Sequence, residues 1–205
     1  MLDLLGKSRI RKKIILSFVY NQGKEFYLSE IARRARTSAG TAQRELNRLL
    51  AQDFITFRKK GNLNIYSLNE TYSLLNEIES IVRKTFGIEV ELGKELRKVR
   101  GVLFAFLYGS YAKGSIKSDS DIDLFIIGNP DEDDVYNAVR KVEDLVGREI
   151  NYHLADEAEF AEKSQRNSFY REILDRPLML AGKEDELRQI IGKALQRGQT
   201  KIPKG

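Results

Sequence analysis

The chain has 205 residues, of which 41% are hydrophobic and 32% charged, a composition typical of a folded protein and not of a disordered one. It contains no cysteine, which excludes disulfides and thiolate metal ligands. The segment from Met1 to Lys13 has only scattered leucines before a basic run, and the longest apolar stretch, residues 101–109, is far too short to cross a bilayer. We therefore expect a cytoplasmic protein that does not contact membranes.

The net charge of +5 is divided unevenly along the chain. Residues 1–70 contain 14 Lys and Arg against 6 Asp and Glu, which gives +8, whereas residues 71–205 contain 21 against 24, which gives −3. A basic part beside a mildly acidic larger part favours binding of a polyanion by the first part alone. A solvated basic surface would have the same composition, so the residue pattern has to decide.

Apolar residues recur at helical spacing within the first 50 residues. They predict helices at residues 8–20 and 28–35, and a third helix that begins after the N-cap Ser38 and has Leu50 on its inner face. Two short strands, residues 55–58 and 64–68, follow and are joined by the turn-forming residues 59–62. Three helices and then a β-hairpin are the element order of a winged helix-turn-helix.

The third predicted helix has a polar face that suits DNA. In helix-turn-helix proteins this helix lies in the major groove, with its N-terminal residues over the base edges. Small residues followed by Gln and Arg permit a close approach and then hydrogen bonds to bases and phosphates. The predicted DNA contacts are Ser38, Thr41, Gln43, Arg44 and Asn47 on the helix, and Lys59 and Lys60 at the hairpin tip.

Around the predicted turn between the second and third helices, Arg33, Arg34 and Arg36 are placed to contact phosphates as well. Winged helices also serve as protein-interaction modules, in which these residues would form a solvated face. The charge of +8 favours DNA as the partner of residues 1–70. A homodimer would suit this interpretation, because such modules often bind two half-sites.

Beyond residue 70 the pattern predicts a different architecture. Two helices come first, at residues 71–85 and 91–100. Buried strands at residues 102–108, 122–127 and 150–154 follow, with a helix at 130–146, and the rest is mostly helical apart from an edge strand at 178–181. The expected fold is therefore a two-domain α+β/α/β protein. Its parts are a winged helix-turn-helix (1–70), a connecting helix (71–87), a small mixed-sheet domain with flanking helices (88–198) and a flexible tail (199–205).

A Gly-Ser turn and a pair of aspartates are the residues most suited to chemistry. Gly109 and Ser110 follow the predicted strand 102–108, and Asp121 comes eleven residues after Ser110, with Asp123 two further on. Residues two apart in a strand share a face, so the two carboxylates project together. They repel each other unless a cation lies between them, and oxygen ligands suit Mg²⁺ or Mn²⁺. Gly109 would let phosphate approach the backbone, and the Ser110 hydroxyl would hydrogen-bond its oxygens.

The arrangement resembles the minimal nucleotidyltransferases of the DNA polymerase β superfamily. Their signature is a Gly-Ser turn, a short spacer and Asp-hydrophobic-Asp, present here as Gly109-Ser110 and Asp121-Ile122-Asp123. This resemblance covers residues 101–154, and a looser likeness to proteins that join a winged helix to this domain covers almost the whole chain. It implies that Asp121 and Asp123 hold two metal ions while a hydroxyl attacks the α-phosphate of a nucleoside triphosphate and pyrophosphate leaves.

The third carboxylate that active members of the superfamily supply has no clear equivalent. It belongs to the strand after the intervening helix, where the natural register places Asn151, and a neutral amide is a poor metal ligand. Glu149 lies one pleat away and is either the third catalytic acid or a surface charge. His153, the only histidine, is expected as a strand-end side chain and not as a catalytic base.

Two functions of different class remain. In the first, a DNA-binding protein carries a nucleotidyltransferase domain that binds Mg-NTP and transfers a nucleotidyl group to an acceptor. In the second, a winged-helix transcriptional regulator carries a transferase-like domain that only senses nucleotide. The intact Gly-Ser and Asp-x-Asp motifs favour the first function, and Asn151 favours the second.

Overall fold

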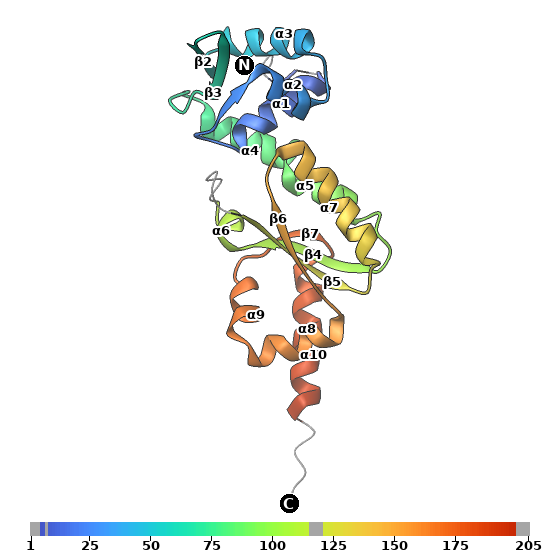
Figure 1. Ribbon diagram of the computed structural model, residues 1–205. Helices are drawn as coiled ribbons and strands as arrows, with labels where there is room; N and C mark the ends of the chain where they lie inside the picture. The colour runs from blue at the N-terminus through green and yellow to red at the C-terminus, as the bar shows by residue number, and fades with distance from the viewer. Residues whose placement is uncertain (1–4, 7, 115–120, 200–205) are drawn as a thin grey trace, which may run out of the picture. The chain divides into compact units, whose positions relative to one another are not determined.

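The computed structural model describes residues 5–6, 8–114 and 121–199, and these form two compact units that are not continuous in sequence (Figure 1). The first unit contains the described residues up to Glu91 together with Arg140–Glu149. The second contains those of 92–115, 121–139 and 150 onward. Residues 88–91 and 140–149, which the sequence assigned to the mixed-sheet domain, thus belong to the first unit. The predicted division into residues 1–70, 71–87 and 88–198 stays a prediction.

All three helices predicted near the N-terminus are present in the first unit. They are α1 (Arg9–Val19), α2 (Leu28–Ala35) and α3 (Ala39–Leu50). The Ser8 and Ser38 side chains cap α1 and α3 by accepting hydrogen bonds from the backbone N–H of Arg11 and Thr41, which satisfies donors that the first helical turn leaves free. Their apolar faces form a core that includes the fully buried Phe18.

The sheet of the first unit has the strand order β1-β3-β2, all antiparallel. The strands are β1 (Glu25–Tyr27), which the sequence did not predict, β2 (Ile55–Lys60) and β3 (Leu63–Leu68). The hairpin turn consists only of Gly61 and Asn62, with Gly61 at φ +61°, because glycine at the first turn position suits a two-residue hairpin. Lys59 and Lys60 were expected in the turn, and this was wrong: they are the last residues of β2.

Two helices follow the hairpin, α4 (Leu75–Thr85) and α5 (Ile88–Leu96). The predicted start of α4 at Thr71 was too early, because the Asn69 side chain accepts hydrogen bonds from the Thr71 backbone and hydroxyl and so holds a turn there. The predicted break at Gly87 is confirmed. A Cβ at Gly87 would lie 2.5 Å from the Tyr20 hydroxyl oxygen, so only glycine fits. α5 begins three residues before, and ends four before, the predicted bounds of 91–100.

The second unit contains a mixed sheet of strand order β6-β5-β4-β7. The strands are β4 (Val102–Tyr108), β5 (Ile122–Gly128), β6 (Ile150–Ala155) and β7 (Leu178–Ala181). Only the β5–β6 pair is parallel among these described strands, and it is connected through α7 (Glu132–Val146). The predicted mixed sheet with an edge strand at 178–181 is therefore confirmed.

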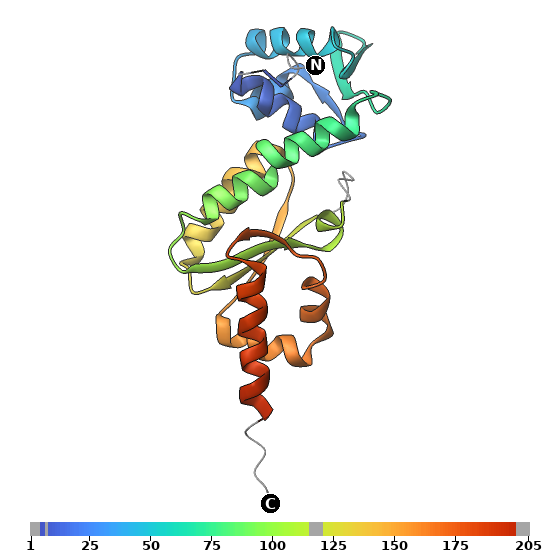
Figure 2. The same cartoon turned by 180° about the vertical axis from the view of Figure 1, so that it is seen from behind.

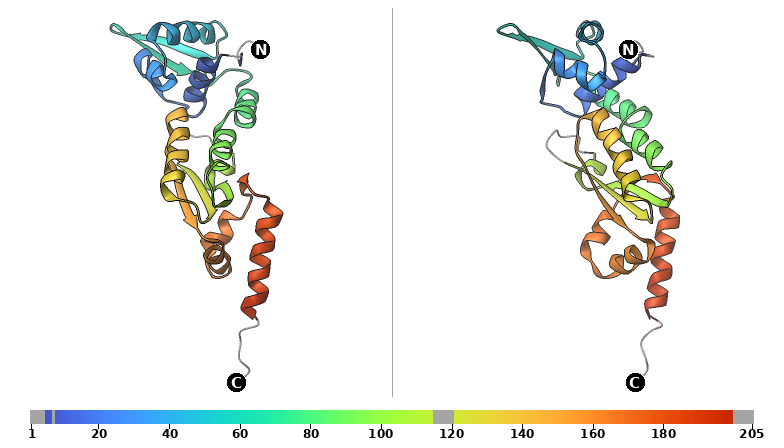
Figure 3. Two further views of the ribbon diagram at one scale, coloured as in Figure 1. Left: turned by 90° about the vertical axis from the view of Figure 1, so that its right-hand side faces the viewer. Right: turned by 45° about the vertical axis from the view of Figure 1, so that its right-hand side comes forward.

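Three helices cover one face of this sheet, α8 (Glu157–Arg166), α9 (Ser168–Ile173) and α10 (Glu184–Gln199) (Figures 1 and 2). The further views in Figure 3 show α8 and α10 on that same side. Under them lies an aromatic core that includes Phe106, Phe125 and Phe160. Ile122, Leu124 and Ile126 are fully buried on the opposite face of β5, so this strand is apolar on both sides except at Asp123.

Among the described residues, none of the helices has both the length and the apolar character needed to cross a bilayer. Of the predicted flexible tail, Gln199 is the last residue of α10, and residues 200–205 lie outside the described residues.

Candidate functional site

Strand β4 passes directly into a single helical turn, α6 (Gly109–Ala112), where the sequence predicted only a turn. Gly109 has φ +71°, and a Cβ on it would lie 2.6 Å from the Asp123 Oδ2 atom. That distance is below any ordinary carbon–oxygen contact, so the Asp123 carboxylate packs against the glycine backbone with no room for a side chain. Ser110 is exposed. The Gly-Ser turn and the second aspartate therefore meet, as the motif implied.

The two aspartates interact electrostatically. Asp121 directly precedes β5 and is exposed, whereas Asp123 is half-buried within it. Burial and the negative charge of Asp121 raise the pKa of Asp123, and His153 partly offsets this. Burial and the charge of Asp123 likewise raise the pKa of the Tyr108 phenol to about 12. A divalent cation between the two carboxylates would relieve this unfavourable charge, and oxygen donors suit Mg²⁺ or Mn²⁺.

Asp123 has a neutral neighbour on each side in the sheet. It pairs with Tyr108 of β4 and with Asn151 of β6, so the register that the sequence suggested for Asn151 is confirmed. Glu149 is exposed and precedes β6. Within the described ranges, no three His, Cys, Asp or Glu side chains come together to hold a metal ion. The donor set near Asp123 is thus two carboxylates with hydroxyl and amide oxygens, and a role for Glu149 as third acid stays a prediction.

Beside the carboxylates lie aromatic side chains that sequence reasoning missed. The His153 ring stacks on Phe125 with centroids 6.1 Å apart, and Phe169 of α9 lies 5.9 Å from both His153 and Tyr108. The alternation along β6 places His153 on the Asp123 face, but nothing in the sequence brings α9 to it. Phe169 could be found only from the fold.

Five of the predicted DNA-contacting residues lie at the N-cap or on the outer face of α3, but they are not all equally available, and Lys59 and Lys60 are the exposed last residues of β2. Ser38, Arg44 and Asn47 are exposed. Gln43 is half-buried because its amide bonds the Asn47 Oδ1 atom at 2.8 Å and the Tyr66 hydroxyl of β3 at 2.9 Å. The Arg44 guanidinium donates to the Thr41 hydroxyl at 3.1 Å. The helix therefore presents an ordered polar face whose Gln43 is held by the sheet.

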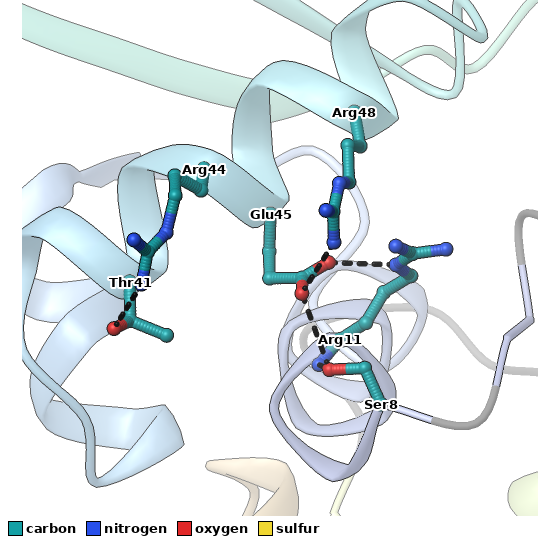
Figure 4. Close-up of polar contacts among 6 residues, drawn as sticks. All are labelled: Ser8, Arg11, Thr41, Arg44, Glu45 and Arg48. Atoms are coloured by element: carbon teal, nitrogen blue, oxygen red, sulfur yellow. Dashed lines mark hydrogen bonds and ion pairs between the residues drawn. The ribbon is translucent and has the colours of Figure 1, made fainter.

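On its inner side, α3 is fixed to α1 through Glu45 (Figure 4). Its carboxylate accepts hydrogen bonds from Arg11 at 2.7 Å, Arg48 at 3.1 Å and Ser8 at 3.2 Å. Burial alone would raise the pKa of Glu45, but the hydrogen bond and charge of Arg11, together with Arg48 and Ser8, lower it. The pair with Arg11 is buried on both sides, so it fixes the orientation of α3 more firmly than surface pairs would.

The arginines around the turn face the segment Arg140–Glu149 of the same unit. Arg36, in the left-handed region at φ 52°, pairs with Asp144 at 3.0 Å. The Arg34 guanidinium lies 4.9 Å from the centre of the Phe26 ring and packs against Gly147. A pocket between these elements is lined by Arg33, Arg34, Arg36, Glu143, Asp144 and Gly147. Arg36 therefore has an ion-pair partner within the unit although its side chain is 70% exposed, and Arg34 packs against Phe26 and Gly147.

A comparison with known protein families finds a match that covers strands β4, β5 and β6 and the two aspartates of the second unit. Residues 90–176 match the family described as polymerase beta, nucleotidyltransferase, and the match includes Gly109, Ser110, Asp121 and Asp123. This part of the chain is therefore a nucleotidyltransferase-type domain. A search of curated protein sequences found no match to the chain.

Some solved structures show weak overall likeness. One is described as a toxin-antitoxin with AMP-PNP (19% identity, 55% of this chain and 88% of that chain covered, TM-score 0.39). Another is the HEPN toxin of Shewanella oneidensis, tri-AMPylated and in complex with the MNT antitoxin (14%, 53% and 85%, TM-score 0.32). A third is reduced HlyU from Vibrio cholerae (15%, 41% and 82%, TM-score 0.33). These low scores establish no function.

Proposed function

We propose that this chain is a DNA-binding protein whose nucleotidyltransferase-type domain binds a nucleoside triphosphate with Mg²⁺ at Asp121 and Asp123. The observation that carries the proposal is the Asp123 carboxylate packed against Gly109, with Asp121 close enough to raise its pKa. In a strand that is otherwise apolar on both faces, a half-buried carboxylate whose pKa is raised by burial and by a second carboxylate is typical of a ligand-binding site.

The residues around the carboxylates have separate tasks in this site. Asp121 and Asp123 would hold Mg²⁺ or Mn²⁺, which supplies neutralising charge for a triphosphate and for the pyrophosphate that leaves on transfer. The Ser110 side chain is exposed, and its hydroxyl would donate a hydrogen bond to a phosphate oxygen. Gly109 leaves the space that the Asp123 carboxylate occupies.

A second function, nucleotide sensing without transfer, is favoured by Asn151. It stands beside Asp123 in the register, at the position where the superfamily resemblance implies a third acid. A neutral amide neither adds to the charge that retains a cation nor accepts the proton of an attacking hydroxyl. Release of pyrophosphate from ATP with Mg²⁺ would separate a transferase from a sensor.

We further propose that residues 1–70 form a winged helix-turn-helix that binds DNA, with residues 71–87 as the connection and 88–198 as the transferase-type domain. The order α1, α2, α3 and the β2–β3 hairpin supports this, as does the +8 charge of residues 1–70. Ser38, Arg44 and Asn47 are exposed on α3, where a recognition helix would meet base edges.

Thermal unfolding with and without ATP and Mg²⁺ tests the nucleotide site. ATP with Mg²⁺ is expected to raise the Tm of the natural protein, because only the folded state binds. Asp123→Asn should abolish this shift. Without ligand it should leave the Tm unchanged or higher, because the raised pKa of Asp123 means that its ionisation disfavours the folded state at neutral pH.

Asp133→Asn provides the matched control. Asp133 is an exposed aspartate in the first turn of α7, beyond the opposite end of β5, and its variant should keep the full ligand-induced shift. An undiminished shift in Asp123→Asn would place the nucleotide elsewhere and disprove the proposed site.

A further inference from the structure

Three rings from different elements meet on the face of the sheet that carries Asp123. Tyr108 of β4, His153 of β6 and Phe169 of α9 are mutual neighbours, with centroid distances of 6.4 Å between Tyr108 and His153 and 5.9 Å for the other two pairs. Phe125 lies beneath them, 6.1 Å from His153 and 6.4 Å from Tyr108. These rings therefore form one aromatic surface, in which the Phe169 ring stands at 83° to Tyr108 and at 69° to His153.

This aromatic surface adjoins the paired carboxylates. Tyr108 is the register partner of Asp123 on β4, and His153 lies two residues after Asn151, the partner of Asp123 on β6. Both side chains interact electrostatically with Asp123, since burial and the charge of Asp123 together raise the pKa of the Tyr108 phenol, and His153 acts to lower the pKa of Asp123. The aromatic surface therefore lies directly beside Asp123, where the triphosphate is proposed to bind.

Two members of the cluster remain open to solvent. Phe169 is 37% exposed and His153 is also exposed, whereas Phe106, Phe125 and Phe160 of the same aromatic core are almost fully buried. Asn167 caps α9 by accepting a hydrogen bond from the Phe169 backbone N–H at 2.9 Å, and the Phe169 ring packs edge-on against Tyr108 and His153. An exposed ring held in place beside a charged site is typical of a surface that a ligand covers.

We propose that His153 and Phe169, backed by the buried Tyr108, form the platform on which the nucleobase of the bound triphosphate stacks. This inference rests on the proposed nucleotide site at Asp121 and Asp123. A nucleobase is a planar π-system one sugar away from the phosphates, and bases stack on aromatic side chains without needing a particular sequence of hydrogen bonds. Because a larger ring covers more of the surface, the platform should favour purine over pyrimidine triphosphates.

The single histidine makes a direct test possible. The chain contains a single histidine, so the imidazole proton resonances of His153 can be followed by NMR without overlap, and the comparison with tripolyphosphate separates the effect of the base from that of the charge at Asp123. Titration with ATP in the presence of Mg²⁺ should move these resonances through the ring current of the adenine. Tripolyphosphate with Mg²⁺ should bind the carboxylates and move the resonances much less.

Affinity measurements on variants complete the test. Phe169→Ala should weaken binding of Mg-ATP by roughly tenfold or more, the loss expected for one base–aromatic stack, and leave the affinity for Mg-tripolyphosphate unchanged. Phe169→Leu keeps apolar volume but no π face, so it should show the same selective loss even if the alanine variant is unstable. Tyr136→Ala removes a 52% exposed ring of α7 that is outside the cluster, and it should change neither affinity.

The outcomes separate the platform from the proposed function. If Mg-ATP binds the natural protein but Phe169→Leu binds it as tightly, and the His153 resonances do not move, the platform is refuted and the nucleotide site stands. Equal losses for ATP and tripolyphosphate would also refute base stacking. If the natural protein binds neither ligand, both proposals fail.

Discussion

Gly109 offers the sharpest perturbation of the site, because Gly114 provides a control on the same segment. Both glycines have positive φ, +71° at Gly109 and +98° at Gly114. A Cβ at Gly109 would lie 2.6 Å from the Asp123 Oδ2 atom, whereas a Cβ at Gly114 would meet no atom of the described residues within 4 Å. Alanine at either position strains the backbone, but only Gly109→Ala also pushes on the carboxylate.

The geometry sets the size of the two effects. Left-handed backbone costs an alanine about 1–2 kcal/mol, which corresponds to a Tm decrease of about 2–8 °C in a chain of this length, and Gly114→Ala should lose at least as much. In Gly109→Ala, the Asp123 carboxylate must also withdraw by about 0.8 Å to reach an ordinary contact of 3.4 Å. Mg²⁺ demands near-ideal ligand positions, and disturbing the groups that orient a metal ligand typically costs about 10- to 100-fold in metal affinity.

Calorimetric titration with Mg-ATP, paired with thermal unfolding without ligand, measures both effects. Gly109→Ala is expected to bind Mg-ATP about 10- to 100-fold more weakly, whereas Gly114→Ala should bind it as the natural protein does despite its lower Tm. Wild-type affinity in Gly109→Ala would refute the assignment of Asp123 as a ligand. An equal loss in Gly114→Ala would show that the segment matters only for stability.

Three further predictions concern the rest of the molecule. Replacing Lys59 and Lys60 by Ala should weaken binding to all DNA sequences alike and lower the salt dependence, whereas Arg44→Ala should change sequence preference in a binding-site selection; salt-insensitive binding would contradict this. Asn151→Asp should increase pyrophosphate release from ATP with Mg²⁺, since it adds a carboxylate beside Asp123; rapid release by the natural protein would exclude the pure sensor. Because the pKa of Glu45 is lowered on folding, its stabilisation is present above the ordinary carboxyl pKa and is lost as pH falls through the folded value. Unfolding curves of Glu45→Gln should therefore lack part of the acid-induced loss of stability seen in the natural protein below about pH 4.5.

The sequence predicted most elements because their apolar spacing is set by local rules. The helices around Ile14, Ile31 and Leu46 and the buried strand from Ile122 were found correctly from spacing alone. Short elements escaped prediction. β1 has three residues, too few to display alternation, and it exists because it pairs with β3.

Within the site, sequence reasoning was limited to one segment at a time. The pairing of Asp123 with Asn151 could be anticipated from the superfamily resemblance, which places the third acid on the strand after the intervening helix. The aromatic surface could not, since Phe169 reaches His153 only through the packing of α9 on the sheet. The internal partners of Arg36 and Arg34 were equally out of reach, because Asp144 and Gly147 are more than a hundred residues away in sequence.

The two-residue turn at Gly61-Asn62 makes the two sides of the hairpin tip unequal. Successive strand residues point to opposite faces, so Lys59 shares a face with Phe57, whose ring contacts Tyr66, and Lys60 shares the other face with Arg58. The Tyr66 side is the one that bonds Gln43 of α3. The chain has no natural cysteine. Two separate variants, Lys59→Cys and Lys60→Cys, would therefore each carry a single label, and the two labels would lie on opposite faces of the hairpin. A cross-linker on Lys59→Cys would capture a partner bound on the Tyr66 face of the hairpin, beside α3. The same reagent on Lys60→Cys would capture a partner bound on the opposite face.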